Sequence, residues 1–222
     1  MTRPAKWSRV AVIDDSVDLP AWLLPVAAGA RGMHVDDITR YAPQHGQGRA
    51  AAVLLLFGDG PDLLLVQRAK DLRSHAGQAA FPGGAMEGDD AGPRAAALRE
   101  ANEETGLDPE GVRLFGQLPD LALPVTGYVV TPVLGWWHTP SPVHPADPHE
   151  VVSVHRVPIA ELTDPANRCR VQHPSGYIGP AFLVQDMLVW GFTAGIIAGL
   201  LDRAGWAEPW DTSRIVHLEA GA

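Results

Sequence analysis

A run of seven apolar residues followed by a five-residue turn restricts the folds open to this chain more than any other feature. Residues Ala51–Phe57 carry no polar side chain, which indicates a strand buried on both faces. The turn, Gly58–Asp62, is rich in glycine, aspartate and proline, and Leu63–Arg68 then begins apolar again. This pattern predicts a hairpin of two strands inside a sheet that other elements cover.

The rest of the chain predicts a mixed sheet with helices on both faces, an α/β class of fold. Arg94–Thr105 is typical of a helix, and Gly106 is well placed to end it in the left-handed conformation. The segment 71–88 is glycine-rich and loop-like. The remaining expected elements are the strands Val112–Leu118, Tyr128–Trp137 and Val151–Val157, a short turn or helix at Ile159–Leu162, and a last helix at Gln185–Ala204.

We expect one domain over residues 1–222, with residues 1–48 as a less defined N-terminal extension. Gly46-Gln47-Gly48 marks the boundary between them, and Pro20–Val26 fits either a short helix or an edge segment. The 46% hydrophobic content is enough to bury one sizeable core.

Charge and cysteine content exclude several classes of function. The formal net charge is −9, and no basic patch or stripe of the kind that binds nucleic acid is present. Cys169 is the single cysteine, so an intrachain disulfide is excluded, which suits a reducing cytoplasm. The longest apolar run, Met187–Leu201, is too short to span a bilayer. We therefore expect a cytoplasmic protein with no membrane or nucleic-acid partner.

Three glutamates in the predicted helix carry the strongest chemical signal. Glu100, Glu103 and Glu104 share one helix face because positions i, i+3 and i+4 are neighbours. Their mutual repulsion costs some tenths of a kcal/mol per pair, and the helix dipole disfavours negative charge near the C-terminal end. Divalent cations such as Mg²⁺ or Mn²⁺ would relieve this cost, because they favour carboxylate oxygen ligands. The alternative reading is an acidic helix face exposed to solvent.

A glycine turn lies just upstream of this helix. Phe81-Pro82-Gly83-Gly84 lets backbone approach closely, and it can offer N–H groups and a carbonyl to a metal-bound diphosphate. Taken alone, a Pro-Gly-Gly sequence indicates only a turn.

Together these residues resemble the Nudix box. That pattern is Gly, five residues, Glu, seven residues, Arg-Glu, an aliphatic residue, any residue, Glu-Glu, any residue, Gly and an aliphatic residue. Gly84 opens it here, and the residues from Arg99 to Leu107 close it. Asp90 replaces the first Glu, the spacer before Arg99 is one residue longer, and Ala101 replaces a larger aliphatic residue. The three catalytic carboxylates are intact.

The segment before the box is similar to the additional signature of coenzyme A pyrophosphatases. That signature is Leu-Leu-Thr, any residue, Arg, a small residue, three residues, Arg, three residues, Gly, three residues and Phe-Pro-Gly-Gly. Arg68, Ala69, Arg73, Gly77 and Phe81–Gly84 fall in register with it, whereas Val66-Gln67 departs from Leu-Thr. The resemblance runs from about Ala51 to Leu162.

The resemblance implies a Nudix α/β/α sandwich with a mixed sheet, and hydrolysis of a diphosphate linked to a nucleoside. Coenzyme A would be cut to 3′,5′-ADP and 4′-phosphopantetheine. Glu100 and Glu104 would bind Mg²⁺ or Mn²⁺, Glu103 would bind a metal or accept the proton of the attacking water, and Arg99 would orient the carboxylates. Glu150 would complete the metal site or act as base, with a simple charge at a strand entry as the alternative.

The substrate-binding candidates lie in the signature segment. Arg68 and Arg73 would bind the substrate phosphates, or they would pair with carboxylates to hold the loop in shape. The other candidates are His75, Gln78, Gly83 and Gly84.

Two rival functions and one question of assembly stay open at this point. One rival is a Nudix hydrolase of another substrate, such as ADP-ribose or NADH. The other is a non-catalytic Nudix module that binds a nucleotide, although such a module would be expected to lose box glutamates. The partner is a small nucleotide in every case, and the sequence leaves a homodimer open.

Overall fold

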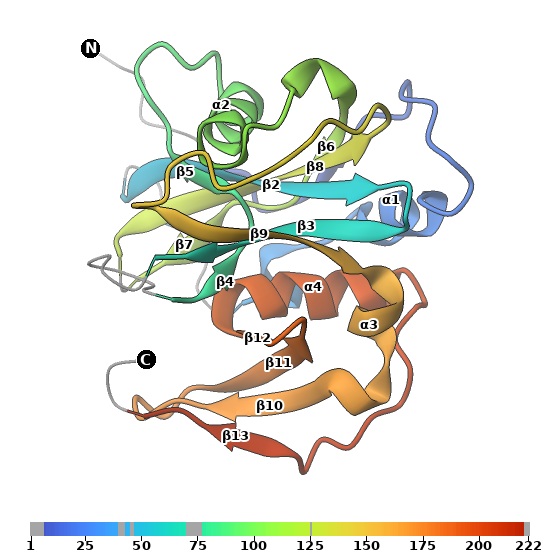
Figure 1. Cartoon of the computed structure of the whole chain (residues 1–222), viewed down its shortest axis with the longest axis vertical. Coiled ribbons are helices and arrows are strands. Elements are labelled where there is room, and N and C mark those ends of the chain that lie inside the picture. Colours follow the sequence, from blue (N-terminus) through green and yellow to red (C-terminus); the bar gives the residue numbers. More distant parts are fainter. Residues whose placement is uncertain (1–6, 40–42, 45–46, 70–76, 125, 220–222) are drawn as a thin grey trace.

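The computed structural model describes residues 7–39, 43–44, 47–69, 77–124 and 126–219. Within these ranges the chain forms one large sheet, a second smaller sheet, and helices packed between and outside them (Figure 1). The layered arrangement of a mixed sheet between helices confirms the predicted α/β class.

The predicted hairpin is present as β2 (Arg49–Gly58) and β3 (Asp62–Arg68). The two strands pair only next to the turn, where Phe57 faces Leu63 and Gly58 faces Asp62, and beyond that point they diverge. The two short strands β4 (Ala79–Ala80) and β5 (Gly83–Ala85) fill the gap, because β4 pairs with β3 and β5 pairs with β2. The glycine turn is therefore anchored between the diverging hairpin strands.

The centre of the large sheet is a long parallel pair. β2 lies parallel to β8 (Tyr128–Trp137), and the register runs from Arg49 opposite Tyr128 to Gly58 opposite Trp137. The main path of the sheet is β1-β6-β8-β2-β3-β4, which mixes parallel and antiparallel neighbours. Its other members are β1 (Val12–Ile13), β6 (Val112–Gln117), β7 (Leu121–Leu123) and β9 (Val151–Pro158).

Helices cover both faces of this sheet (Figure 1). On one face lies α2 (Pro93–Thr105), which ends where predicted because Gly106 adopts a left-handed φ of 69° and its N–H bonds the carbonyl of Asn102. On the other face lie α1 (Leu24–Ala30) and α4 (Gly191–Arg203). The interior of each face forms its own apolar cluster.

The prediction of one helix over Gln185–Ala204 was wrong at its start. Gln185 and Asp186 form a turn with φ angles of 47° and 61°, and Met187–Val189 is a strand, β12. It belongs to a second sheet in the order β12-β11-β10-β13, which the sequence analysis did not predict. The other members are β10 (Arg168–Gln172), β11 (Ile178–Val184) and β13 (Ile215–His217), and α4 lies between the two sheets (Figure 1).

The described residues of the N-terminal segment 1–48 are part of the same core. β1 pairs with β6, and α1 packs against α4. The remaining short elements are α3 (Ile159–Thr163), at the predicted place, and the 3₁₀ turns η1 (Val35–Asp37), η2 (Pro109–Gly111) and η3 (Pro165–Asn167). None of the described helices combines the length and apolar content needed to cross a membrane.

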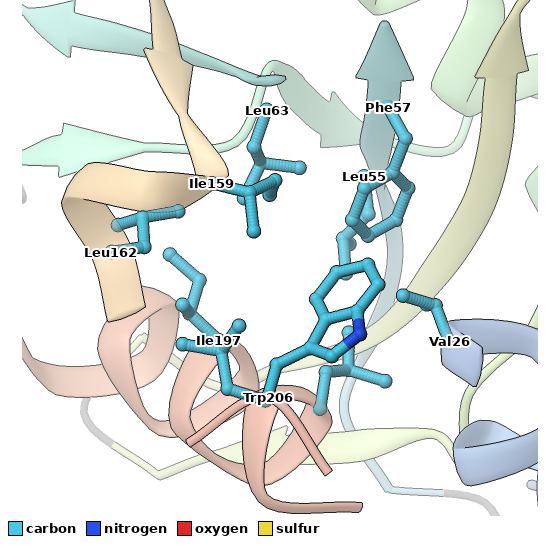
Figure 2. Close-up of a pocket in the computed structure, with 10 residues that line it drawn as sticks. Val26, Leu55, Phe57, Leu63, Ile159, Leu162, Ile197 and Trp206 are labelled. Carbon is cyan, nitrogen blue, oxygen red and sulfur yellow. The ribbon is translucent and has the colours of Figure 1, made fainter. Parts of the chain in front are cut away.

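An apolar pocket lies on the α4 face of the large sheet (Figure 2). Trp206, just after α4, lies across it from Leu63, Ile159 and Leu162. Every lining residue is apolar, so the pocket offers no group for phosphate or metal chemistry.

Candidate active site

Alanines bring α2 close to the sheet. Ala96, Ala97 and Ala101 are fully buried, and they pack in the same cluster as Ala52 and Leu54 of β2. A helix that contacts a sheet through methyl groups can lie closer to it than one with larger side chains. This close contact brings the acidic side chains of α2 up against β5.

Glu104 is the most buried of the three predicted glutamates. Its residue is 2% exposed, one carboxylate oxygen accepts the N–H of Gly83 at 3.0 Å, and the other lies 3.4 Å from Nη1 of Arg68. Burial raises the pKa of Glu104 to about 7, although both of these partners act to lower it. A nearby cation would offset this cost of burial, because it favours the ionised carboxylate.

Glu100 lies against the second glycine of the turn. A Cβ atom on Gly84 would lie 2.5 Å from the carboxylate carbon of Glu100, so no larger residue fits there without displacement. Gly83 has a φ of 155°, and a Cβ atom there would collide with the backbone of β2. Burial raises the pKa of Glu100, while Arg99 at 3.1 Å lowers it. Gly84 therefore permits the close contact of β5 with α2, and Gly83 permits that of β5 with β2.

Arg99 links the helix to the segment before it. Its Nε and Nη2 donate to the two oxygens of Asp90, each at 3.1 Å, and Nη2 also donates to the carbonyl of Ala85 at 3.0 Å. On the other side, Nη1 lies 2.8 Å from Glu103 and 3.1 Å from Glu100. The hydrogen bonds from Arg99 hold the pKa of Asp90 below its ordinary value.

The sequence predicts that Arg99 orients the carboxylates, and its ion pairs place it beside Glu100 and Glu103. Its bidentate partner Asp90 was not predicted, since in the sequence Asp90 is only a departure from the Nudix box. The longer spacer between Asp90 and Arg99 was the sequence feature that could have indicated this contact.

Residues 139–150, between β8 and β9, contact the C-terminal end of α2 and end at Glu150. The N–H groups of His144 and Ala146 donate to the carbonyls of Thr105 and Glu104, each at 3.0 Å, and so satisfy the end of the helix. Glu150 follows directly, is exposed, and has a charge that contributes to the raised pKa of both Glu100 and Glu104. The predicted catalytic residue Glu150 is therefore brought to the same acidic centre.

The predicted substrate-binding residues divide into three groups. Gly83 and Gly84 lie on β5, directly beside Glu104 and Glu100. Arg68 is a partner of Glu104, which fits the alternative reading of that residue, and its N–H donates to the carbonyl of Gln78 at 3.0 Å. Arg73 and His75 lie outside the described residues.

The donor set fits a hard divalent cation. Glu100 and Glu104 combine burial, raised pKa values and mutual repulsion, and a cation between them would reverse the repulsion. In the described part of the chain, no three His, Cys, Asp or Glu side chains are already grouped closely enough to hold a metal ion. Glu103 instead makes its ion pair with Arg99, and its side chain is 56% exposed.

Comparison with known proteins assigns the chain to a family independently of the site geometry. The family model described as the NUDIX domain matches residues 46–174. A relative named uncharacterized Nudix hydrolase NudL from Cronobacter sakazakii is 45% identical over 166 residues, which cover 71% of this chain and 83% of the relative. The protein of the same name from Escherichia coli K12 is 42% identical, with the same shares covered.

Solved structures resemble the chain more distantly. A Nudix hydrolase from M. smegmatis, RenU, is 20% identical, with a TM-score of 0.48 over 74% of this chain and 89% of that chain.

Proposed function

The chain belongs to the Nudix hydrolase family, and on that basis we propose that it hydrolyses the diphosphate of coenzyme A or a coenzyme A derivative. The coarser activity, hydrolysis of a nucleoside diphosphate derivative, follows from the family. The proposed products are 3′,5′-ADP and 4′-phosphopantetheine. The observation that carries the proposal is the match of Leu65–Gly84 to the coenzyme A pyrophosphatase signature.

The position of that signature segment supports a role in catalysis or specificity. The segment begins in β3, and it contributes Arg68 and Gly83, both of which contact Glu104. Phe81 anchors it, since this side chain is 2% exposed. A sequence that distinguishes one group of Nudix hydrolases from the rest therefore forms one wall of the acidic centre.

Nudix hydrolases generally use divalent metal ions, and we propose Mg²⁺ or Mn²⁺ for this chain. Glu100 and Glu104 would hold the cation, with Glu103 or Glu150 as a further ligand. When bound, such a cation neutralises phosphate oxygens and favours attack by water on phosphorus.

The chain's own residues prepare this chemistry. The N–H of Gly83 fixes the orientation of the Glu104 carboxylate, and Arg99 holds Glu100 and Glu103 by ion pairs. The more exposed carboxylates, Glu103 and Glu150, are the proposed acceptors of the proton from the attacking water. Their exposure allows that proton to pass to solvent.

A panel of diphosphate substrates tests the proposal directly. The purified chain would be assayed with Mg²⁺ and with Mn²⁺ on coenzyme A, an acyl-coenzyme A, ADP-ribose and NADH, with products identified by mass. We expect 3′,5′-ADP and 4′-phosphopantetheine, and a kcat/KM for coenzyme A well above that for the other diphosphates. Preferred cleavage of ADP-ribose or NADH would contradict the substrate assignment, and binding without turnover would contradict catalysis.

The two signature arginines allow a finer test of what recognises coenzyme A. If Arg73 binds the 3′-phosphate, Arg73→Ala should weaken coenzyme A by about 1.5–3 kcal/mol and spare dephospho-coenzyme A. Arg68 is held by Glu104, so Arg68→Ala should reduce activity on both substrates equally. Equal losses for Arg73→Ala as well would exclude 3′-phosphate recognition by that arginine.

A further inference from the structure

Arg168, the first residue of β10, is a buried arginine in the second sheet. It is 2% exposed. Its guanidinium lies between two aromatic rings, 5.1 Å from the centroid of Phe182 on β11 and 4.9 Å from that of Trp210. Both contacts are of the cation–π type, in which the face of a ring attracts a cation.

Two of the three guanidinium nitrogens, Nε and Nη1, are buried and have no hydrogen-bond partner among the described residues. No carboxylate in that part of the chain forms an ion pair with Arg168. An arginine side chain stays protonated in proteins, so the positive charge persists. The negative charge of Asp202 on α4 acts to raise the pKa of Arg168 without forming an ion pair with it, whereas burial lowers that pKa.

Arg168 differs from Arg99 and Arg68, which are only partly buried and which both face a carboxylate. Arg99 fills its N–H groups with carboxylates and a carbonyl, and Arg68 contacts Glu104. A buried charge without a counter-ion is costly, and ring contacts do not satisfy N–H donors. A planar guanidinium with free donors is the group that proteins use to bind an oxyanion.

We propose that Arg168 is the base of an anion-binding site that takes a small oxyanion, a phosphate or carboxylate group, with Trp210 as its cover. Trp210 lies in the segment 207–214 between α4 and β13, and its neighbours Glu208, Pro209 and Asp211 are exposed. This segment is bonded to the second sheet and its neighbouring loop at its far end, where the Arg214 side chain donates to the carbonyl of Ala166 and the Arg214 carbonyl accepts the N–H of Arg170. Displacement of the half-buried Trp210 ring is the movement that would open the guanidinium to an anion.

The site is separate from the acidic centre. It lies on the second sheet, with α4 and the large sheet between it and α2 (Figure 1). The proposal does not rest on the proposed function, and it can be tested with the metal removed. Under those conditions the carboxylates on α2 repel anions rather than bind them.

Thermal unfolding of the full chain in excess chelator provides the experiment. Inorganic phosphate and acetate would each be titrated against sodium chloride of equal ionic strength. At about a hundredfold excess over its Kd, the preferred anion should raise Tm by about 5–10 °C. Phosphate and acetate together show whether the site prefers a tetrahedral oxyanion or a carboxylate.

Variants assign the effect to Arg168. Arg168→Met, which is similar in length and uncharged, should abolish the anion-dependent rise, whereas Trp210→Phe should keep it. If Arg168→Met fails to fold, two other variants replace it. Arg168→Lys should weaken the anion-dependent rise in Tm, because lysine lacks the planar fork of arginine. Trp210→Ala, which uncovers the site, should retain that rise.

Two results would overturn the proposal. The first is a wild-type Tm that follows ionic strength alone, with no excess for phosphate or acetate. The second is an anion effect that survives Arg168→Met unchanged. Destabilisation by Asp202→Asn with no anion effect in the wild type would identify Asp202 as the counter-ion instead.

Discussion

The helices α2 and α4 have the same length, thirteen residues, and cover opposite faces of one sheet, yet they contact it in different ways. The buried residues of α4 include Ile196, Ile197, Leu200 and Leu201. Those of α2 are three alanines, Glu104 and Thr105. The α4 face is an apolar core, whereas the α2 face contains a buried carboxylate, Glu104.

The difference shows which helix mainly stabilises the fold and which helix carries the proposed catalytic residues. Large aliphatic side chains stabilise α4 through the area that they bury. The position of α2 depends more on hydrogen bonds and ion pairs, such as those of Arg99 and of the Gly83 N–H. We therefore expect changes on α2 to reduce activity, and changes on α4 to reduce stability.

Removing the metal should have the largest effect. Excess chelator should abolish turnover, because the acidic centre then has no cation to bring the diphosphate to three carboxylates. Added Mg²⁺ or Mn²⁺ should restore turnover, measured as product release. Full activity in chelator would show that the carboxylates act without a metal.

Replacing single carboxylates on α2 should come next. Each of Glu100→Gln, Glu103→Gln and Glu104→Gln should reduce kcat by at least about 10²-fold, because the charge is lost while the shape is kept. The matched control is Glu110→Gln, an exposed change outside the centre, which should leave kcat unchanged. If the three variants kept wild-type activity, α2 would be an ordinary acidic surface helix.

The same variants should separate activity from stability in metal-free buffer. Burial raises the pKa of Glu104 from 4.5 to about 7, so its ionised form destabilises the folded state. The wild type should therefore lose stability relative to Glu104→Gln as the pH rises from about 4.5 through about 7, in denaturant unfolding with chelator. A constant difference across this pH window would refute the assignment to Glu104.

Truncation on α4 should give the opposite result. Ile196 is fully buried, so Ile196→Ala should lower the free energy of unfolding by about 2–5 kcal/mol. Ile196→Val removes one methylene and should cost about 0.5–1.5 kcal/mol. Well below Tm, both variants should keep kcat near the wild-type value. A large loss of kcat in a folded variant would mean that the two faces are coupled.

An effect smaller than that of Ile196→Ala is expected at the end of α2. Gly106→Ala forces a side chain into a left-handed position and brings its Cβ to 2.9 Å from the His144 ring. The backbone strain alone should cost about 1–2 kcal/mol in the free energy of unfolding. Gly88→Ala is the control, because a Cβ there has open space and no left-handed φ. Equal stability of the two variants would show that the helix end adapts freely.

Strong local patterns made much of the fold predictable. The hairpin, α2, Gly106 and the strand Tyr128–Trp137 were confirmed because long apolar runs, turn residues and a helix stop all agree there. The last helix was predicted too long, and β12 was missed, because Met187–Leu201 is almost continuously apolar. Such a run does not show where a strand such as β12 ends and a helix such as α4 begins.

The acidic centre was predictable for a different reason. Helix periodicity places Glu100 and Glu104 on one face, and glycines mark a close approach of backbone. The bond between Arg99 and Asp90 depends on how a loop folds back, which spacing alone does not give. The isolation of Arg168 depends on segments that meet only in the folded chain, so no local pattern could reveal it.

The parallel pair of β2 and β8 has a consequence for the order in which the chain folds. Its partners are about 80 residues apart in sequence, and α2 lies within the connection between them. Closing so long a loop costs entropy before any pairing repays it, so topology of this kind slows folding. A chain emerging from the ribosome completes β2, β5 and α2 before β8 is available. We therefore expect hydrogen exchange during refolding to protect the β2–β3 turn early, and the amides between β2 and β8 late.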